Sequence, residues 1–175
     1  MKEETYSLDT ILATFTKTKK DSAKKRLIFD QTPLNGIGAK WIIAFFISLP
    51  VMLYIGIFNP TMFDMLGIAQ AIIFFVVFLS MVMILVIALT FINNNKVLRQ
   101  VTPSWNNSFP EVDLKLALAS GGTPYKDFFK HYSEAVKLGL KGEALKTHLA
   151  QAFKVMQEEN ADLYDAIASA RSGRR

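Results

Sequence analysis

The sequence predicts an all-α membrane protein, in which an antiparallel two-helix transmembrane hairpin carries a cytoplasmic helical C-terminal domain. Three observations lead to this fold class. The 53 residues from Trp41 to Asn93 contain a single formally charged side chain, Asp64. Residues 1–40 and residues 94–175 each carry a net charge of +3, as expected of segments that face water. Apolar residues also recur at helical spacing in the C-terminal segment.

The N-terminal tail, residues 1–40, contains a short amphipathic helix and a basic run. Ser7 is the expected N-cap, and Leu8, Ile11, Leu12 and Phe15 form one apolar stripe. Two interpretations stay open for this tail. The helix and run lie on an anionic inner leaflet and contact lipid headgroups, or the run is a solvated basic linker. The basic residues concerned are Lys17, Lys19, Lys20, Lys24, Lys25 and Arg26.

Two apolar runs, residues 41–58 and 67–92, predict the transmembrane helices of a hairpin spanning 41–93. Pro50 lies in the middle of the first helix, where it predicts a static kink or a hinge. We expect a neighbouring helix or Ser48 to satisfy the carbonyl that Pro50 leaves free. Ser80 is expected to bond its own preceding turn or to contact another helix.

The distribution of basic residues predicts the orientation of the hairpin. Lys and Arg flank both apolar runs, whereas the eight-residue loop from Asn59 to Leu66 has neither. Because cytoplasmic loops are enriched in basic residues, both termini should be cytoplasmic and the loop external. The predicted location is therefore the bacterial inner membrane, which the chain crosses more than once.

Residues 94–107 are expected to be a turn-rich linker, in which Trp105 is either an interface anchor or a docking residue. Residues 108–175 then predict a cytoplasmic helical domain of three helices. Ser108 and Glu111 form a capping box for a helix over 109–119. Thr123 and Pro124 start the second helix, which ends at Gly139 and presents Phe128, Phe129 and Tyr132.

The third helix should run from Gly142 to Arg171 and contains a heptad-like seam. An Asn at an inward seam position fixes register and partner number in a coiled coil. The seam could pack inside the domain, against the helix of Phe128, or against another subunit. Its residues are Leu149, Phe153, Met156, Asn160, Leu163 and Ile167.

No set of residues predicts a reaction. The chain has no cysteine, and His131 and His148 lie 17 residues apart without a metal-binding motif around them. The sequence therefore predicts no enzyme activity, no cofactor, no metal site and no small-molecule substrate. It also argues against direct nucleic-acid binding, because the modest basic excess adjoins a membrane segment and does not alternate with aromatic residues.

The layout suggests two functions. A basic tail before "WIIAFFISLP", a tight hairpin and a tail opening at "SFPEVDLKLALASGGTPYKDFF" resemble the small inner-membrane proteins of conjugative transfer and Dot/Icm-like type IV secretion systems of IncI-type plasmids. That resemblance implies a non-catalytic subunit that assembles with other inner-membrane subunits, with itself, or with both. The alternative is a holin-like or exclusion-type protein that oligomerises in the bilayer.

Overall fold

The computed structural model describes residues 5–19, 22–119 and 121–172, which form seven α-helices, one 3-10 turn and one two-stranded sheet. The chain divides into two compact units. The hairpin unit consists of residues 28–96. The second unit, here named the two-tail domain, combines the described residues up to Leu27 with those from Val97 onward.

The two-tail domain begins with α1 (Leu8–Phe15), as predicted. Ser7 is its N-cap, since the Ser7 hydroxyl accepts a hydrogen bond from the Thr10 backbone N–H at 3.2 Å. The apolar stripe of α1 is fully buried within the domain and not laid out for a lipid surface. The Tyr6 backbone N–H donates to the hydroxyl of Ser104 at 2.9 Å, so the two tails are joined across 98 residues of sequence.

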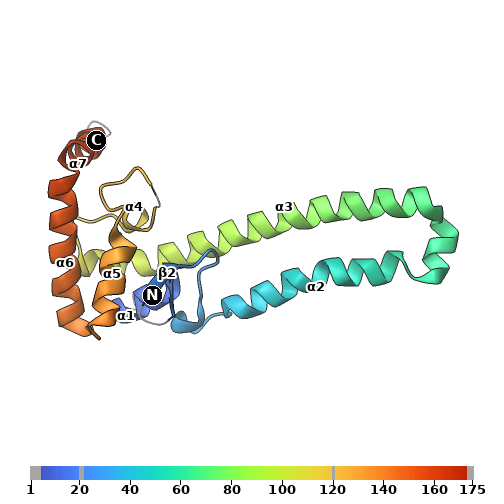
Figure 1. Ribbon diagram of the computed structural model, residues 1–175, viewed down its shortest axis with the longest axis horizontal. Helices are drawn as coiled ribbons and strands as arrows, with labels where there is room; N and C mark the ends of the chain where they lie inside the picture. Colours follow the sequence, from blue (N-terminus) through green and yellow to red (C-terminus); the bar gives the residue numbers. More distant parts are fainter. Residues whose placement is uncertain (1–4, 20–21, 120, 173–175) are drawn as a thin grey trace. The chain divides into compact units, whose positions relative to one another are not determined.

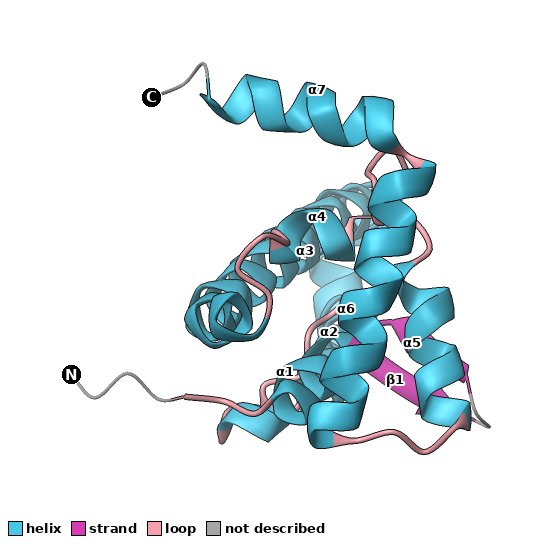
Figure 2. Cartoon of the chain, turned by 90° about the vertical axis from the view of Figure 1, so that its left-hand side faces the viewer, coloured by secondary structure: helices cyan, strands magenta, loops and turns pink. Residues whose placement is uncertain are grey.

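The basic run after α1 forms an antiparallel hairpin of β1 (Thr16–Lys19) and β2 (Ser22–Lys25) (Figure 2). The all-α prediction is therefore wrong here, and so is the solvated linker, which was one of the two interpretations of this run. Thr16 and Ala23 are buried while Lys17 and Lys24 are exposed, which is the alternation of a strand with one buried face. The alternation is difficult to recognise in the sequence, because most residues of this run are charged.

Four helices follow in the C-terminal part: α4 (Leu114–Leu118), α5 (Phe128–Lys137), α6 (Gly142–Glu159) and α7 (Ala161–Ser172). Their core is a cluster of aromatic rings whose centroids lie 4.8–6.2 Å apart, formed by Trp105, Phe109, Phe128 and Phe153. The Trp105 indole N–H donates to the Val112 carbonyl at 2.8 Å, and its side chain is fully buried. Trp105 is therefore a docking residue of the domain core.

The hairpin unit contains the 3-10 turn Thr32–Leu34, α2 (Ala39–Ile57) and the first part of α3 (Pro60–Ser108). Figure 1 shows α2 and α3 running antiparallel from a tight connection. Gly67 interrupts α3 with a φ of 72° and a ψ of 166°, a conformation that favours glycine, so residues 60–66 form a short separate helix. The predicted loop is thus largely helical, and the predicted start of the second apolar helix at Gly67 coincides with this break.

Several helix boundaries differ from the prediction. The helix expected to start at Thr123 and Pro124 begins only at Phe128, because residues 121–127 form bends and turns. The expected linker, residues 94–107, is helical, because α3 continues to Ser108. Val97, Val101 and Trp105 recur every four residues and are completely buried. This packing overrides the turn-forming residues between and around them, which are Pro103, Ser104 and the Asn residues at 94, 95, 106 and 107. The helix expected over 109–119 starts instead after Asp113, whose carboxylate accepts the Lys115 backbone N–H at 2.7 Å.

The long C-terminal helix is also divided. Asn160 has a φ of −125° and a ψ of 40° and is the C-cap of α6, with its side-chain amide donating to the Met156 carbonyl at 2.8 Å. The helix that carries the seam therefore ends at Asn160, the residue that the sequence suggested as the register-fixing Asn of a coiled coil. Leu149, Phe153 and Met156 lie before the break and are buried in the two-tail domain.

Candidate functional site

The hairpin unit exposes a large apolar surface. Of the 28 large apolar side chains that are exposed among the described residues, 24 lie between Trp41 and Ile92. α2 and α3 are the two helices long and apolar enough to cross a membrane, and only 6% of each apolar window is buried. A core helix of a soluble domain would be mostly buried, so the length, composition and exposure of these helices suggest a membrane protein.

Only a narrow stripe of each helix faces its neighbour. Phe46 of α2 and Val82 of α3 are each 9% exposed, and Ala71 is fully buried. Near the connection, Phe58 meets Phe75 edge to face with ring centroids 5.6 Å apart. The remaining circumference of both helices is apolar and bare, as expected of surfaces that contact lipid or other membrane helices.

Two hydroxyl groups within the spans bond carbonyls of their own preceding turn. The Ser80 hydroxyl donates to the Val76 carbonyl at 3.0 Å, which is the bond to its own preceding turn that the sequence predicts. The Ser48 hydroxyl donates to the Phe45 carbonyl at 2.7 Å, whereas Pro50 frees the carbonyl four residues before it, that of Phe46. The expectation that Ser48 satisfies the freed carbonyl is therefore wrong, although α2 continues through Pro50.

A polar clasp closes the foot of the hairpin, and the sequence reading missed it. The Asn94 side-chain oxygen accepts the Phe29 N–H at 2.9 Å, and the Asn93 side-chain amide donates to the Phe29 carbonyl at 3.0 Å. Gln31 in turn donates to the Asn93 side-chain oxygen at 2.5 Å. The run of three Asn at 93–95 directly after an apolar span was the available signal. The clasp ties the segment before α2 to the end of the apolar part of α3.

The predicted lipid-contact residues divide into two groups. Lys17, Lys19 and Lys24 are exposed on the β1–β2 hairpin. Lys25 and Arg26 instead bond within the domain: the Lys25 ammonium donates to the Leu118 carbonyl, and the Arg26 Nε donates to the Thr16 carbonyl at 2.8 Å. Partial burial lowers the pKa of Lys25. Lys20 lies outside the described residues.

The predicted partner contacts also divide. Phe128, Tyr132, Phe153 and Met156 are buried in the two-tail domain. The seam therefore packs internally up to Met156, against α5, which is one of the two alternatives that the spacing left open. Burial raises the pKa of Tyr132 above its ordinary value. The remaining predicted contacts keep part of their surface accessible: Phe129, Asn160, Leu163 and Ile167.

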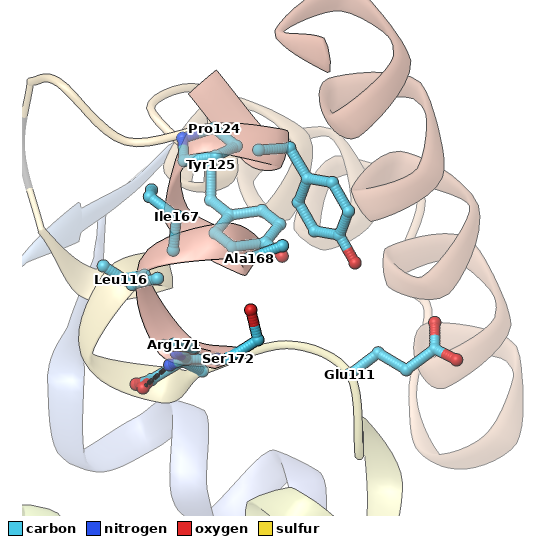
Figure 3. A pocket seen from close by; sticks show the side chains of 10 residues that line it. Glu111, Leu116, Pro124, Tyr125, Ile167, Ala168, Arg171 and Ser172 are labelled. Atoms are coloured by element: carbon cyan, nitrogen blue, oxygen red, sulfur yellow. Dashed lines mark hydrogen bonds and ion pairs between the residues drawn. The ribbon is translucent and has the colours of Figure 1, made fainter. Parts of the chain in front are cut away.

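The described part of the two-tail domain contains a pocket of about 390 Å³ beside α7 (Figure 3). Asp113 and Arg171 form an ion pair at its edge, and Ile167 and Ala168 of α7 line it together with Tyr125. Burial raises the pKa of Tyr125, whose hydroxyl accepts a hydrogen bond from the Gln157 side chain at 2.9 Å. The pocket follows the line along which α7 meets the rest of the domain.

The described residues offer no group of three or more His, Asp and Glu side chains that could hold a metal ion. His131 is paired with Glu134 at 3.2 Å, and His148 lies on α6. The chain was compared with protein-family models, curated proteins and solved structures. No family model, curated protein or solved structure matches it.

Proposed function

We propose that the protein is a non-catalytic assembly subunit of a multiprotein complex in the bacterial inner membrane. One observation carries the proposal. The chain combines a hairpin of two apolar helices that are exposed over most of their surface with a folded domain that is formed by the segments before and after the hairpin. The resemblance in layout to small proteins of conjugative transfer and type IV secretion systems makes such a secretion machine the proposed setting.

The dimensions and surface of the hairpin support its insertion into a bilayer. The 19 residues of α2 correspond to about 28 Å of helix, close to the hydrocarbon thickness of about 30 Å. The part of α3 after Gly67 is about 60 Å long, so only its apolar first half fits in the membrane. Lipid or partner helices cover the exposed apolar side chains, because a continuous apolar surface of this size is unfavourable in water.

The fold also supports a single side for both termini. The segments before and after the hairpin pack into one domain, so a chain that crosses the membrane twice returns to the side on which it began. Lys40 and Lys96 are exposed at the two ends of the apolar segment, whereas the connection has no basic residue. We infer that the domain is cytoplasmic and that the connection lies on the outer side.

The division of surfaces favours an assembly role. The hairpin offers contact surface but no ionisable relay inside its spans, since Asp64 lies in the connection. The two-tail domain is a folded body that a partner can recognise. A holin-like protein acts by oligomerising in the bilayer and has no need of such a domain. The experiment below distinguishes the holin-like function from the assembly function.

The test places a photo-crosslinking residue at Ile47 or Ile84, which are 66% and 68% exposed, in the full chain in its native host. A matched control carries it at Phe46, which is 9% exposed and faces the hairpin interior. We expect the protein to resist alkaline extraction and the two exposed positions, but not Phe46, to capture other membrane proteins. Crosslinks to lipid alone would contradict the proposal, and permeabilisation of the membrane by the chain alone would replace it with the holin-like function.

A further inference from the structure

The outer face of the β1–β2 hairpin gathers positive charge in a defined geometry. The strand register pairs Lys17 with Lys24, and Cβ atoms of directly opposed residues lie about 5 Å apart. Lys19 follows Lys17 by two residues and shares its face, diagonal to Lys24 at about 7–8 Å. All three side chains are exposed. We name Lys17, Lys19 and Lys24 the lysine triad.

The opposite face of the hairpin fixes the direction in which the triad points. Thr16 and Ala23 are 3% and 4% exposed and pack into the domain. The Ala23 backbone N–H donates to the Ser133 hydroxyl at 3.0 Å, and the same hydroxyl lies 3.2 Å from the Ala23 carbonyl. Because α5 holds β2 in this way, the triad faces away from the core.

Directly opposed like charges destabilise a strand pair. The ion pairs among the described side chains are those of His131, Lys146 and Arg171, and none reaches the triad. An anion from outside the chain would therefore relieve the repulsion between Lys17 and Lys24. Lysine ammonium groups bind phosphate as point charges, which suits a mobile headgroup better than a shaped ligand.

We propose that the lysine triad binds the phosphate groups of anionic phospholipids in the bilayer that holds the hairpin. This inference rests on the proposed function, since it requires an inserted hairpin. In the sequence, short lengths of chain connect the triad's domain to the hairpin on both sides. Residues 26–38 join β2 to α2, and Val97 of the domain directly follows Lys96 in α3. A basic residue near an anionic surface strengthens binding by about five-fold.

The test uses the full chain with a reporter thiol, Ala152→Cys, at a position 6% exposed in the domain core. The protein is placed in nanodiscs of phosphatidylcholine alone or of an equal mixture with phosphatidylglycerol, and the rate of thiol labelling reports opening of the domain. We expect the anionic lipid to slow labelling by at least about five-fold, the value of one lysine. Lys17→Gln, Lys19→Gln and Lys24→Gln combined should abolish that protection.

The matched control combines Lys130→Gln, Lys137→Gln and Lys154→Gln, which removes the same charge from exposed positions on α5 and α6. It should keep the protection, and loss of protection in the control would show that net charge alone matters. Protection that survives in the triad variant would also overturn the inference. Equal protection by inorganic phosphate or duplex DNA in phosphatidylcholine discs, lost in the triad variant, would assign the triad to those ligands. Failure to enter either disc would contradict the membrane proposal itself, whereas entry without any lipid effect would contradict the inference alone.

Discussion

Replacing Leu12 by Ala should destabilise a domain whose other half lies beyond the hairpin in sequence. Leu12 lies on α1 and is 0% exposed, with the described core around it drawn from both tails. Truncating a fully buried Leu to Ala removes about 2–5 kcal/mol from the free energy of unfolding, through lost burial and the cavity left behind. Even the lower value corresponds to a roughly 30-fold larger population of opened domain.

The assay again uses the reporter thiol Ala152→Cys, since the chain has no other cysteine. Its labelling rate should rise by about 30-fold or more in Leu12→Ala, because α6 opens together with α1. Leu138→Ala is the matched control, with the same chemistry at a side chain that is 67% exposed, and should change the rate by less than about three-fold. An unchanged rate in Leu12→Ala would refute the reasoning, since α1 would then be no part of the domain.

Three further outcomes are expected. Trp105→Phe should lower the free energy of unfolding by about 2 kcal/mol, because the Val112 carbonyl loses its indole donor. Trp41→Phe, at a residue 76% exposed, should leave the free energy of unfolding unchanged, and the thiol-labelling assay measures both variants. Burial raises the pKa of Tyr132, so its contribution to stability is complete below about pH 10 and is lost as the pH rises through the higher pKa of the folded state. The tyrosinate absorbance of Tyr132, identified by its loss in Tyr132→Phe, should therefore appear only above the ordinary pKa of tyrosine. Its appearance at the ordinary pKa would contradict the prediction. Asn160→Leu should cost about 1 kcal/mol, from the lost bond to the Met156 carbonyl, and leave the oligomeric mass in solution unchanged; altered self-association would restore the intermolecular seam.

Local patterns predicted most of the helices. The apolar stripe and Ser7 cap of α1, the two long apolar helices and the end of α5 before Gly139 all rest on neighbouring residues, so they were accessible from the sequence. The strands were missed because lysines dominate this segment, in which Thr16 and Ala23 are the buried residues among those that the structure describes.

The candidate sites depended more on distant contacts. The bond from Tyr6 to Ser104 and the clasp of Phe29 with Asn94 join residues 98 and 65 apart, and no local spacing encodes such pairs. The break at Asn160 could not be seen in the sequence, because the spacing of Asn160 is that of an inward polar residue in a coiled coil, and the same spacing results when Asn160 ends a helix as its C-cap.

The central claim is that the hairpin crosses the membrane and that the two-tail domain lies on one side of it. Single cysteines at Thr5, Thr61 and Ser169, all exposed, can be probed with a membrane-impermeant thiol reagent in intact cells. The account predicts that Thr61→Cys is labelled, and that Thr5→Cys and Ser169→Cys are labelled only after the inner membrane is opened. Labelling of either tail position in intact cells, or of all three positions alike, would contradict it.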